Sequence, residues 1–305
     1  MKKVIRIGTR DSELALWQAT TVQNQLQNLG YLTELVPVKS TGDLILDKPL
    51  YELGITGIFT KTLDVAMIKG QIDIAVHSMK DVPTSLPEGI IEACVLKRAK
   101  VQDILVHKGL GFLETKGVIA TGSLRRKAQW LHRYPNHQVV GLRGNVNTRL
   151  QKLKDNSWSG AIFAAAGLER INLLPKDFVN LDWMIPAPAQ GAMLVVANEK
   201  DTYGKEACLQ LNHKQTEICV QVEREFLKEL EGGCTAPIGA LAQIKNDRML
   251  FEGALFSLDG KQKLSIEKEI PLKELQNHGK KWAQTLLDQG GRQIMQTIRE
   301  ALENK

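Results

Sequence analysis

The sequence predicts an α/β protein with two doubly wound domains, each a mostly parallel sheet covered by helices, and a small α+β domain at the C-terminal end. Apolar strand-like runs alternate with helix-like runs from residue 4 to residue 197, and this alternation is typical of βαβ units. After residue 216 the order changes to one helix, hairpin-like strands and further helices. A length of 305 residues is sufficient for two or three such domains.

The first domain is expected to begin with a strand that runs into a Gly-Thr-Arg turn and a helix. Asp11 or Ser12 can serve as the N-cap of that helix, and Gly30 ends it. The turn-rich residues 40–57 predict a long, mobile connection. The expected strands are residues 4–7, 32–38 and 72–76, and the expected helices are residues 13–28 and 59–69.

The second domain repeats the alternation, and a Pro-rich stretch at residues 185–191 returns the chain to the first domain as a stiff hinge. Strands are expected at residues 104–106, 118–120, 139–140, 161–165 and, after the hinge, 192–197. The third domain is expected to hold a helix at residues 216–231, strands near residue 241 and at residues 249–256 and 264–270, and C-terminal amphipathic helices. We therefore expect domain 1 at residues 1–97 and 192–212, domain 2 at residues 98–191 and domain 3 at residues 213–305.

The composition is that of an ordinary soluble globular protein, with 43% hydrophobic and 24% charged residues. The first residues lack the apolar core of a signal peptide, and no later run is long enough to span a bilayer. We expect a cytoplasmic protein without a membrane partner. The four cysteines are far apart and include no CxxC pair, which argues against a zinc site and against a disulfide framework.

The most unusual stretch is residues 121–149, which is rich in basic residues and contains no Asp or Glu. Its basic residues are Arg125, Arg126, Lys127, Arg133, Arg143 and Arg149. Two short strands here lead into Gly-rich turns and helices, which present free N–H groups and the positive end of the helix dipole. Arg adds a planar fork that can hold a carboxylate or phosphate. We interpret the stretch as a polyanion site, with a solvated basic helix as the alternative.

A second candidate site follows the strand at residues 72–76, where the sequence continues HSMKDVP. Ligands of open α/β sheets bind beyond the carboxyl ends of the strands, which is where Ser78, Lys80 and Asp81 are expected. A carboxylate near cationic groups can stabilise a developing cation or transfer a proton. The alternative for Asp81 is a turn cap before the proline. A lone His after an apolar strand is more often hydrogen-bonded structure than a catalyst, so we interpret His77 as structural.

Arg10 occupies the equivalent turn after the first strand, with Ser12 beside it and Gln18 two helical turns later. The arginines expected at strand ends are thus Arg10, Arg125, Arg126 and Arg143. If the two α/β units face each other, these turns line a shared anion-binding cleft, which Arg149 and Arg170 could extend. Phosphate specificity is not predicted, because the chain has no GxxxxGK[ST] loop and no GxGxxG.

Cys234 follows two glycines just past a predicted helix end, which predicts an exposed loop position. A thiolate is the strongest side-chain nucleophile available for covalent attachment, and an exposed loop suits that role. The alternative is an incidental small residue. Cys94, in an apolar strand, and Cys219, in a helix, are interpreted as core residues.

Taken together, these segments resemble the porphobilinogen deaminase (hydroxymethylbilane synthase) family over nearly the whole chain. The matching segments are TR at residues 9–10, LALWQ at 14–18, GD at 42–43, HSMKDVP at 77–83, SLRR at 123–126, LRGN at 142–145, TR at 148–149, AGL at 166–168, QGA at 190–192, EGGC at 231–234 and PI at 237–238. No single segment is decisive, but the ordered set is very specific.

The resemblance implies a transferase of tetrapyrrole and heme biosynthesis. Such an enzyme joins four porphobilinogen molecules head to tail, releases ammonia each time, and then hydrolyses off linear hydroxymethylbilane. A dipyrromethane cofactor, itself made from substrate, would be tied by a thioether to Cys234. The resemblance further implies that the two α/β domains are periplasmic-binding-protein-like. It implies a monomer with porphobilinogen as its small-molecule substrate, no metal and no nucleic-acid partner.

The resemblance also assigns roles by position. Asp81 matches the catalytic aspartate, which would stabilise the azafulvene-like cation left by loss of ammonia and mediate proton transfers. The residues that match groups holding the cofactor's carboxylates are Ser78, Lys80, Thr121, Ser123, Arg125 and Arg126. The residues that match groups binding the substrate or the growing chain are Arg10, Ser12, Gln18, Arg143, Arg149, Arg170 and Gln190.

The sequence departs from the family pattern in three places. Glu52 and Thr56 take positions often held by lysine in the mobile connection, so no lid role is transferred to them. Gly122 replaces a serine, which removes one hydroxyl near the cofactor. Residues 186–190 read PAPAQ rather than the usual PAVGQ, which predicts a stiffer hinge. None of these changes affects the cysteine, the aspartate or the arginines named above, so activity is still expected.

Two other classes of protein share part of this pattern. A non-catalytic two-lobed solute-binding protein would have the same lobes and anion cleft, but the missing signal peptide and a third domain carrying Cys234 count against it. A nucleic-acid-binding protein could use the basic stretch, but few aromatic residues accompany its arginines. Retention on heparin or DNA at moderate salt separates the second class from the enzyme.

Overall fold

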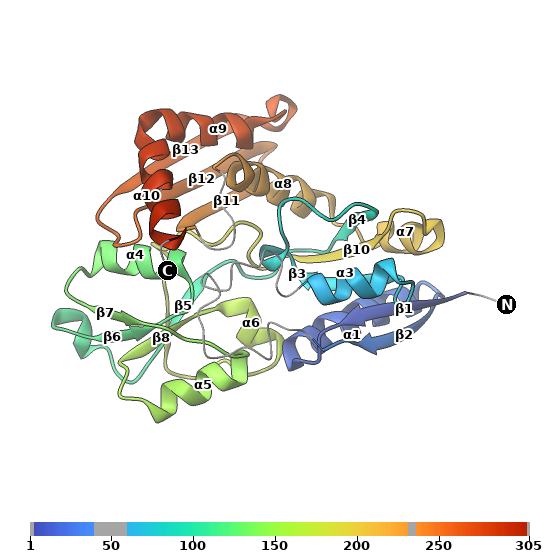
Figure 1. The fold of residues 1–305 in the computed structure, drawn as a ribbon, viewed down its shortest axis with the longest axis horizontal. Helices are drawn as coiled ribbons and strands as arrows, with labels where there is room; N and C mark the ends of the chain where they lie inside the picture. The colour runs from blue at the N-terminus through green and yellow to red at the C-terminus, as the bar shows by residue number, and fades with distance from the viewer. Residues whose placement is uncertain (1–2, 40–59, 231–235, 304–305) are drawn as a thin grey trace. The chain divides into compact units, whose positions relative to one another are not determined.

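The computed structural model describes residues 3–39, 60–230 and 236–303. The chain divides into two compact units. Of the described residues, the first unit comprises 3–39, 60–99 and 191–218, and the second comprises 100–190, 219–230 and 236–303. The predicted fold class is confirmed: two five-stranded sheets are each flanked by helices, and a separate three-stranded sheet follows near the C-terminal end (Figure 1). The three-domain boundaries expected from the sequence stay a prediction.

The first unit contains a sheet with the strand order β2-β1-β3-β10-β4. Its strands are β1 (Val4–Thr9), β2 (Leu32–Pro37), β3 (Ile74–Ser78), β4 (Ile90–Val95) and β10 (Met193–Asn198). Strands β1, β2 and β3 are parallel, whereas β10 runs antiparallel to both β3 and β4. The carboxyl ends of β1 and β3 therefore lie at the same edge of the sheet, where a binding site is expected.

Helices cover both faces of this first sheet. They are α1 (Glu13–Asn28), α3 (Lys61–Ile68) and α7 (Thr202–Leu209). Ile5, Ile7 and Val76 share a buried cluster with Val22 of α1 and Ala207 of α7. On the opposite face the backbone approaches closely, because a Cβ at Gly8 would lie 2.3 Å from Ile72 Cδ1 and 3.1 Å from Leu63 Cδ2. Only glycine fits there without a shift.

The second unit contains a sheet of the same design, with the order β7-β6-β8-β5-β9. Its strands are β5 (Asp103–His107), β6 (Val118–Ala120), β7 (Gln138–Val140), β8 (Gly160–Ala164) and β9 (Phe178–Asn180). Strands β6, β7 and β8 are parallel. Strand β5 runs antiparallel to both of its neighbours, β8 and the edge strand β9. The helices are α4 (Leu124–Arg133), α5 (Val146–Asp155) and α6 (Ala165–Arg170).

The packing of this second sheet explains why the sequences of its strands are continuously apolar rather than alternating. Ile104 and Phe163 pack with Leu153 of α5 on one face, whereas Leu105 and Ile162 are in the cluster of Trp130 of α4 on the other. Alternate residues of each strand thus face different helices, as in doubly wound sheets covered on both sides.

The third sheet is an antiparallel meander in the second unit. Its strands are β11 (Ile238–Lys245), β12 (Arg248–Phe256) and β13 (Lys263–Pro271), and the accompanying helices are α8 (Lys214–Glu229), α9 (His278–Leu286) and α10 (Arg292–Glu303). The β11–β12 hairpin turns at Asn246 and Asp247, both with positive φ. A two-residue turn needs positive φ at both positions if its twist is to match that of the two strands. Phe251 of β12 packs against Phe226 of α8 and Trp282 of α9, with ring centroids 5.1 and 4.5 Å apart.

The structure differs from the sequence-based expectation in several elements, among them β1, which ends at Thr9 rather than at Ile7. Strand β3 ends at Ser78 rather than at Val76, because its ladder with β10 continues through Leu194–His77 and Met193–Ser78. The edge strand β9 and the helix α7 were not expected. The expected mobile connection at residues 40–57 lies outside the described residues.

The Pro-rich connection before β10 contains a strained alanine. Ala189 has φ of 61°, and its N–H donates to the buried Glu223 carboxylate at 2.6 Å. The other oxygen of Glu223 accepts from the N–H of Ala242 in β11 at 2.7 Å. This carboxylate therefore holds the connection against the third sheet. It also keeps Ala189 at a positive φ, a backbone conformation that favours glycine.

Replacing Ala189 with Gly is expected to stabilise the protein by about 0.5–1 kcal/mol, because glycine adopts positive φ without the steric cost borne by an L-residue. The midpoint of urea unfolding measures this. Ala187, which is not among the described residues with positive φ, provides the matched control: Ala187→Gly should destabilise, since it only adds freedom to the unfolded chain. Equal destabilisation by both substitutions would show that Ala189 is not strained.

Candidate functional site

A cavity of about 70 Å³ lies at the carboxyl ends of β1 and β3 in the first unit. The residues lining it that carry polar or charged side chains are Arg10, Ser12, Gln18, Thr60, His77, Ser78 and Asp81. Five of these were predicted as site residues from the sequence. The cavity is small, polar and placed at the sheet edge where ligands of α/β folds bind.

The turn after β1 positions Arg10 and Ser12. Thr9 is the last residue of β1, and its Oγ1 donates to the carbonyl of Ala15 at 3.0 Å in the first turn of α1. This bond folds the chain back, so that Arg10 directly follows the strand and Ser12 is the N-cap residue of α1. Both residues line the cavity and are partly buried.

Gln18 connects α1 to the end of β3. Its side chain is buried, and Nε2 donates to Ser78 Oγ at 2.9 Å. The Ser78 hydroxyl lies 3.4 Å from Gln18 Oε1, so the same amide can also accept from it. The Gln18 amide therefore fixes the orientation of the Ser78 hydroxyl at the cavity wall.

Asp81 and Lys80 lie on one turn of 3₁₀-helix, Met79–Asp81, that directly follows β3. The turn is anchored at its start, because Met79 is buried and its N–H donates to the carbonyl of Ala192 at 3.1 Å. Val82 N–H donates to the carbonyl of Met79 and closes the turn. Asp81 lines the cavity, and Lys80 is partly buried beside it in the chain.

His77 is only 6% exposed, and its backbone pairs with Leu194 of β10. Burial, and secondarily the positive charge of Arg10, lower the pKa of the His77 ring to about 4, so the ring is neutral at neutral pH. Within the described part of the chain, its buried Nε2 has no hydrogen-bond partner. The interpretation of His77 as a structural residue rather than a catalyst stays a prediction.

The second group of predicted residues gathers around Asp103 in the second unit. Asp103 is the first residue of β5 and is fully buried. Arg125 Nη1 donates to one of its oxygens at 2.7 Å, and Arg126 Nε and Nη2 approach the other at 3.0 and 2.8 Å. Gln190, also fully buried, donates from Nε2 to Asp103 at 3.0 Å and to the carbonyl of Val101 at 2.7 Å.

Asp103 excludes the alternative of a solvated basic helix for Arg125 and Arg126. The window 121–149 contains no acid, but the fold brings one in from outside it, so Arg125 and Arg126 are buried ion-pair partners rather than solvated charges. Sequence reasoning missed Asp103. The available signal was an acidic residue at the start of the otherwise apolar run at residues 103–106, because a charge in a buried strand requires a partner.

The cluster still carries excess positive charge. Its two guanidinium groups and one carboxylate leave a net charge of +1. Burial, opposed by the charge of Asp103, lowers the pKa of Arg125. Its buried Nε has no hydrogen-bond partner among the described residues. A buried N–H donor without a partner in a cationic cluster is suited to bind an anionic group.

The turn before α4 organises Thr121 and Ser123 at this cluster. Thr121 Oγ1 accepts from the N–H of Ser123 at 3.2 Å. Ser123 is the N-cap of α4, where its Oγ accepts from the N–H of Arg126 at 3.4 Å. The two hydroxyls thus shape the helix start that carries Arg125 and Arg126.

Arg143 and Arg149 follow β7 in the same unit. Gly144, with φ of 111°, turns the chain after Arg143, and Asn145 N-caps α5 by accepting from the N–H of Thr148 at 2.9 Å. Arg149 Nε donates to the carbonyl of Gly144 at 2.7 Å. Both arginines are partly buried, so each guanidinium can present donors without being fully solvated.

Arg170 is the last residue of α6. Burial lowers its pKa to about 10, and it therefore remains a cation at neutral pH. The other cysteines follow expectation, because Cys94 and Cys219 are buried. Cys234, Glu52 and Thr56 lie outside the described residues.

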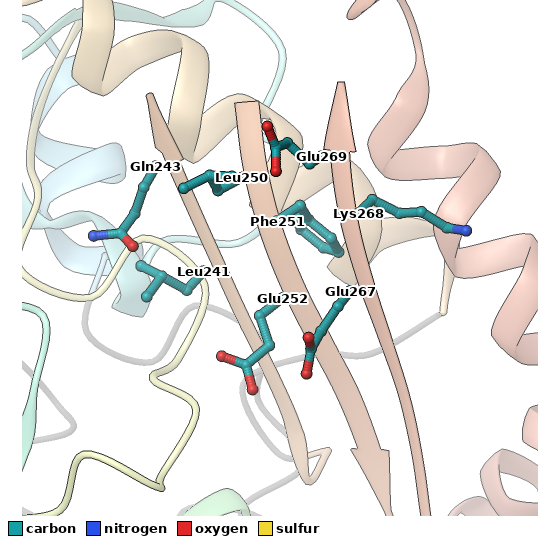
Figure 2. A pocket seen from close by; sticks show the side chains of 8 residues that line it. All are labelled: Leu241, Gln243, Leu250, Phe251, Glu252, Glu267, Lys268 and Glu269. Atoms are coloured by element: carbon teal, nitrogen blue, oxygen red, sulfur yellow. The ribbon is translucent and has the colours of Figure 1, made fainter. Parts of the chain in front are cut away.

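A larger cavity of about 460 Å³ lies on the third sheet and contains none of the predicted site residues. Figure 2 shows its acidic side chains, Glu252, Glu267 and Glu269, on neighbouring strands. Glu252 faces Glu267 across the β12–β13 ladder, and burial followed by the charge of Glu267 raises the pKa of Glu252.

No helix in the part of the chain that the structure describes is long and apolar enough to cross a membrane.

Known proteins resemble this chain along almost its whole length. The family model "Porphobilinogen deaminase, dipyromethane cofactor binding domain" matches residues 5–206, and "Porphobilinogen deaminase, C-terminal domain" matches residues 217–288. The porphobilinogen deaminase of Pelobacter propionicus is 38% identical over 300 residues, which cover 96% of this chain and 97% of that protein. The porphobilinogen deaminase of Pelotomaculum thermopropionicum is 39% identical over 307 residues, which cover 98% of each chain.

Among solved structures, the methionine-binding protein MetQ is similar at a TM-score of 0.45 and 16% identity, over 68% of this chain and 89% of that one. The two matched family models together cover the strand-end cavity, the Asp103 cluster and the third sheet. On the strength of those models and of relatives this similar over their full lengths, the chain belongs to the porphobilinogen deaminase family of transferases.

Proposed function

We propose that the protein joins four porphobilinogen molecules head to tail on a dipyrromethane primer, releases one ammonia per addition, and hydrolyses off linear hydroxymethylbilane. The observation that carries the proposal is the gathering of Arg10, Ser12, Gln18, Ser78 and Asp81 around one polar cavity in a chain of this family. These residues combine an anion-binding cation, hydroxyl and amide groups, and a carboxylate. The cation suits the acidic side chains of the substrate, and the carboxylate suits the positive charge that forms as ammonia leaves.

Asp81 is the proposed catalytic residue. Loss of ammonia leaves a cation delocalised over the pyrrole ring and its methylene carbon, and a fixed carboxylate near the pyrrole N–H stabilises that charge. The same carboxylate can accept and return protons as each new bond forms. Its position on a turn anchored by the buried Met79 keeps it fixed while the substrate moves.

The arginines are proposed to bind carboxylates. Arg10 would hold a substrate carboxylate at the cavity, with Ser12 and Gln18 as neutral neighbours. Arg143, Arg149 and Arg170 would hold the side chains of the growing chain, which gains two carboxylates with each pyrrole. Gln190 matches a substrate-binding position, but its amide is buried against Asp103, so we propose that it acts by positioning the Asp103 cluster.

The dipyrromethane cofactor is proposed to be attached through a thioether to Cys234. When bound, it supplies the pyrrole carbon to which the first substrate is joined. The excess charge of the Asp103 cluster supports Arg125 and Arg126 as the residues that hold its carboxylates. Thr121 and Ser123, with Ser78 and Lys80, would complete the polar groups around it.

The function is tested by incubating the purified protein with porphobilinogen and measuring ammonia and linear tetrapyrrole by mass spectrometry. We expect four molecules of ammonia per tetrapyrrole. Binding of porphobilinogen without ammonia release would contradict the proposed function and favour a solute-binding protein. The cytoplasmic location, the monomeric state and the absence of a nucleic-acid partner expected from the sequence stay predictions.

Replacing Arg143 with Leu should slow elongation by about 10- to 100-fold, because a hydrogen bond to a charged group contributes about 1.5–3 kcal/mol. Enzyme carrying incomplete chains should accumulate, and intact mass after a short pulse of porphobilinogen measures their length. Lys154→Leu, on the exposed part of α5, removes the same charge as a control and should leave the chain-length distribution unchanged. A normal distribution in the Arg143 variant would remove this residue from the proposed site.

A further inference from the structure

His77 is a buried polar group that the proposed mechanism does not use. It lines the same cavity as Arg10 and Asp81, and its side chain is 6% exposed. Its Nε2 atom is buried and has no hydrogen-bond partner within the described chain. A buried donor or acceptor left unpaired is costly, and one that lines a binding cavity can be satisfied by a ligand.

The charges around His77 limit what that ligand group can be. The charged side chains that line the cavity are Arg10 and Asp81, and the other polar groups there are neutral. Arg10 is the neighbour whose charge acts on the ring, so a cationic group beside His77 would be repelled. A carboxylate in the same place would be attracted by Arg10 and would accept a hydrogen bond from an imidazole N–H.

We infer that His77 is a further substrate-binding residue, whose Nε2–H donates a hydrogen bond to the same substrate carboxylate that Arg10 binds. This inference rests on the proposed function, because it takes the pyrrole dicarboxylate as the ligand. An uncharged donor next to a guanidinium adds a second, directional contact without adding a second positive charge. It also makes the site selective, because a ligand lacking the carboxylate leaves the buried Nε2 unpaired.

The ring is not suited to transfer protons in the reaction. Its pKa of about 4 means that it carries no extra proton to donate at neutral pH, whereas Asp81 lines the same cavity as a carboxylate. Loss of the His77 contact should therefore weaken substrate binding much more than it slows the chemical step.

The test compares four forms of the holoenzyme: wild type, His77→Leu, His77→Gln and His77→Asn. Intact mass confirms that each carries its cofactor, and thermal unfolding confirms that each is folded. A Gln side chain can place an amide N–H near the position of the imidazole Nε2, whereas the shorter Asn side chain reaches only the Nδ1 position. Steady-state kinetics are measured with porphobilinogen and with two analogues, each lacking one of its two carboxylates.

We expect His77→Leu to raise KM for porphobilinogen by about 10- to 100-fold, with kcat lowered much less. His77→Gln should recover most of the affinity, and His77→Asn should not. With the analogue that lacks the contacted carboxylate, His77→Leu should cause no further loss, since the two changes remove the same interaction. If the Leu variant does not fold, the difference in KM between the Gln and Asn variants tests the inference.

Three results would overturn the inference: an unchanged KM in folded His77→Leu, equal losses with all three substrates, or equal KM values for the Gln and Asn variants. Failure of the proposed function itself is recognised separately, because wild-type protein would then release no ammonia from porphobilinogen.

Discussion

Replacing Asp81 with Asn is expected to lower kcat by about two to four orders of magnitude, the range that one positioned acid–base group contributes. The amide keeps the size of the side chain but can neither take up a proton nor neutralise a developing cation. The variant should still carry dipyrromethane when it is prepared with the cofactor in place, because the residues proposed to hold it are unchanged. Single-turnover release of ammonia measures the chemical step directly.

Glu88→Gln is the matched control, since Glu88 is an exposed carboxylate a few residues further along the same connection. It should turn over at the wild-type rate. If Asp81→Asn keeps more than about a tenth of the wild-type kcat, the fixed-carboxylate mechanism is wrong and another group must perform the proton transfers.

The second large effect is expected for stability rather than turnover. Asp103→Asn should lower the free energy of unfolding by about 3–5 kcal/mol, because it leaves two buried guanidinium groups without their counter-charge. Arg125 and Arg126 both contact Asp103 within 3.0 Å and are themselves buried. Urea unfolding followed by tryptophan fluorescence measures the loss, since Trp130 is buried on α4, the helix that carries both arginines.

The exposed pair Arg248–Glu269 provides the comparison for this prediction. Glu269→Gln removes one carboxylate from an ion pair whose side chains are 44% and 53% exposed, so it should cost less than about 1 kcal/mol. Similar losses for both substitutions would mean that the Asp103 cluster contributes no more than a surface salt bridge.

Local sequence was sufficient for the elements that depend on short-range pattern. The alternation of apolar runs with capped helices predicted β1, α1 and the βαβ run of the second sheet, because such elements are set by periodicity and capping. The end of β3 was misplaced because its last two residues pair with Leu194 and Met193. A ladder formed with a strand more than a hundred residues away leaves no local signal. The three-residue strand β9 was missed because its only ladder partner among the described strands, β5, is also distant in the sequence.

The candidate site was predictable where strand ends determine it. Arg10 and Asp81 follow strands whose carboxyl ends share one sheet edge, Ser78 is the last residue of one of these strands, and the structure gathers all three at one cavity. The charge balance of the basic stretch was not predictable from the stretch itself, because its acid, Asp103, lies on another strand. The unpaired nitrogen of His77 was equally hidden, since sequence identifies a polar residue but not whether its partners are present.

The central claim is that Cys234 carries a covalent dipyrromethane, and intact mass under denaturing conditions tests it most directly. We predict extra mass equal to a dipyrromethane in the wild type and in Cys219→Ser, whose cysteine is buried in α8, and its absence from folded Cys234→Ser. If the wild type is purified without it, incubation with porphobilinogen should restore it. Retention of the extra mass in Cys234→Ser, or a wild-type protein that never acquires it, would contradict the account.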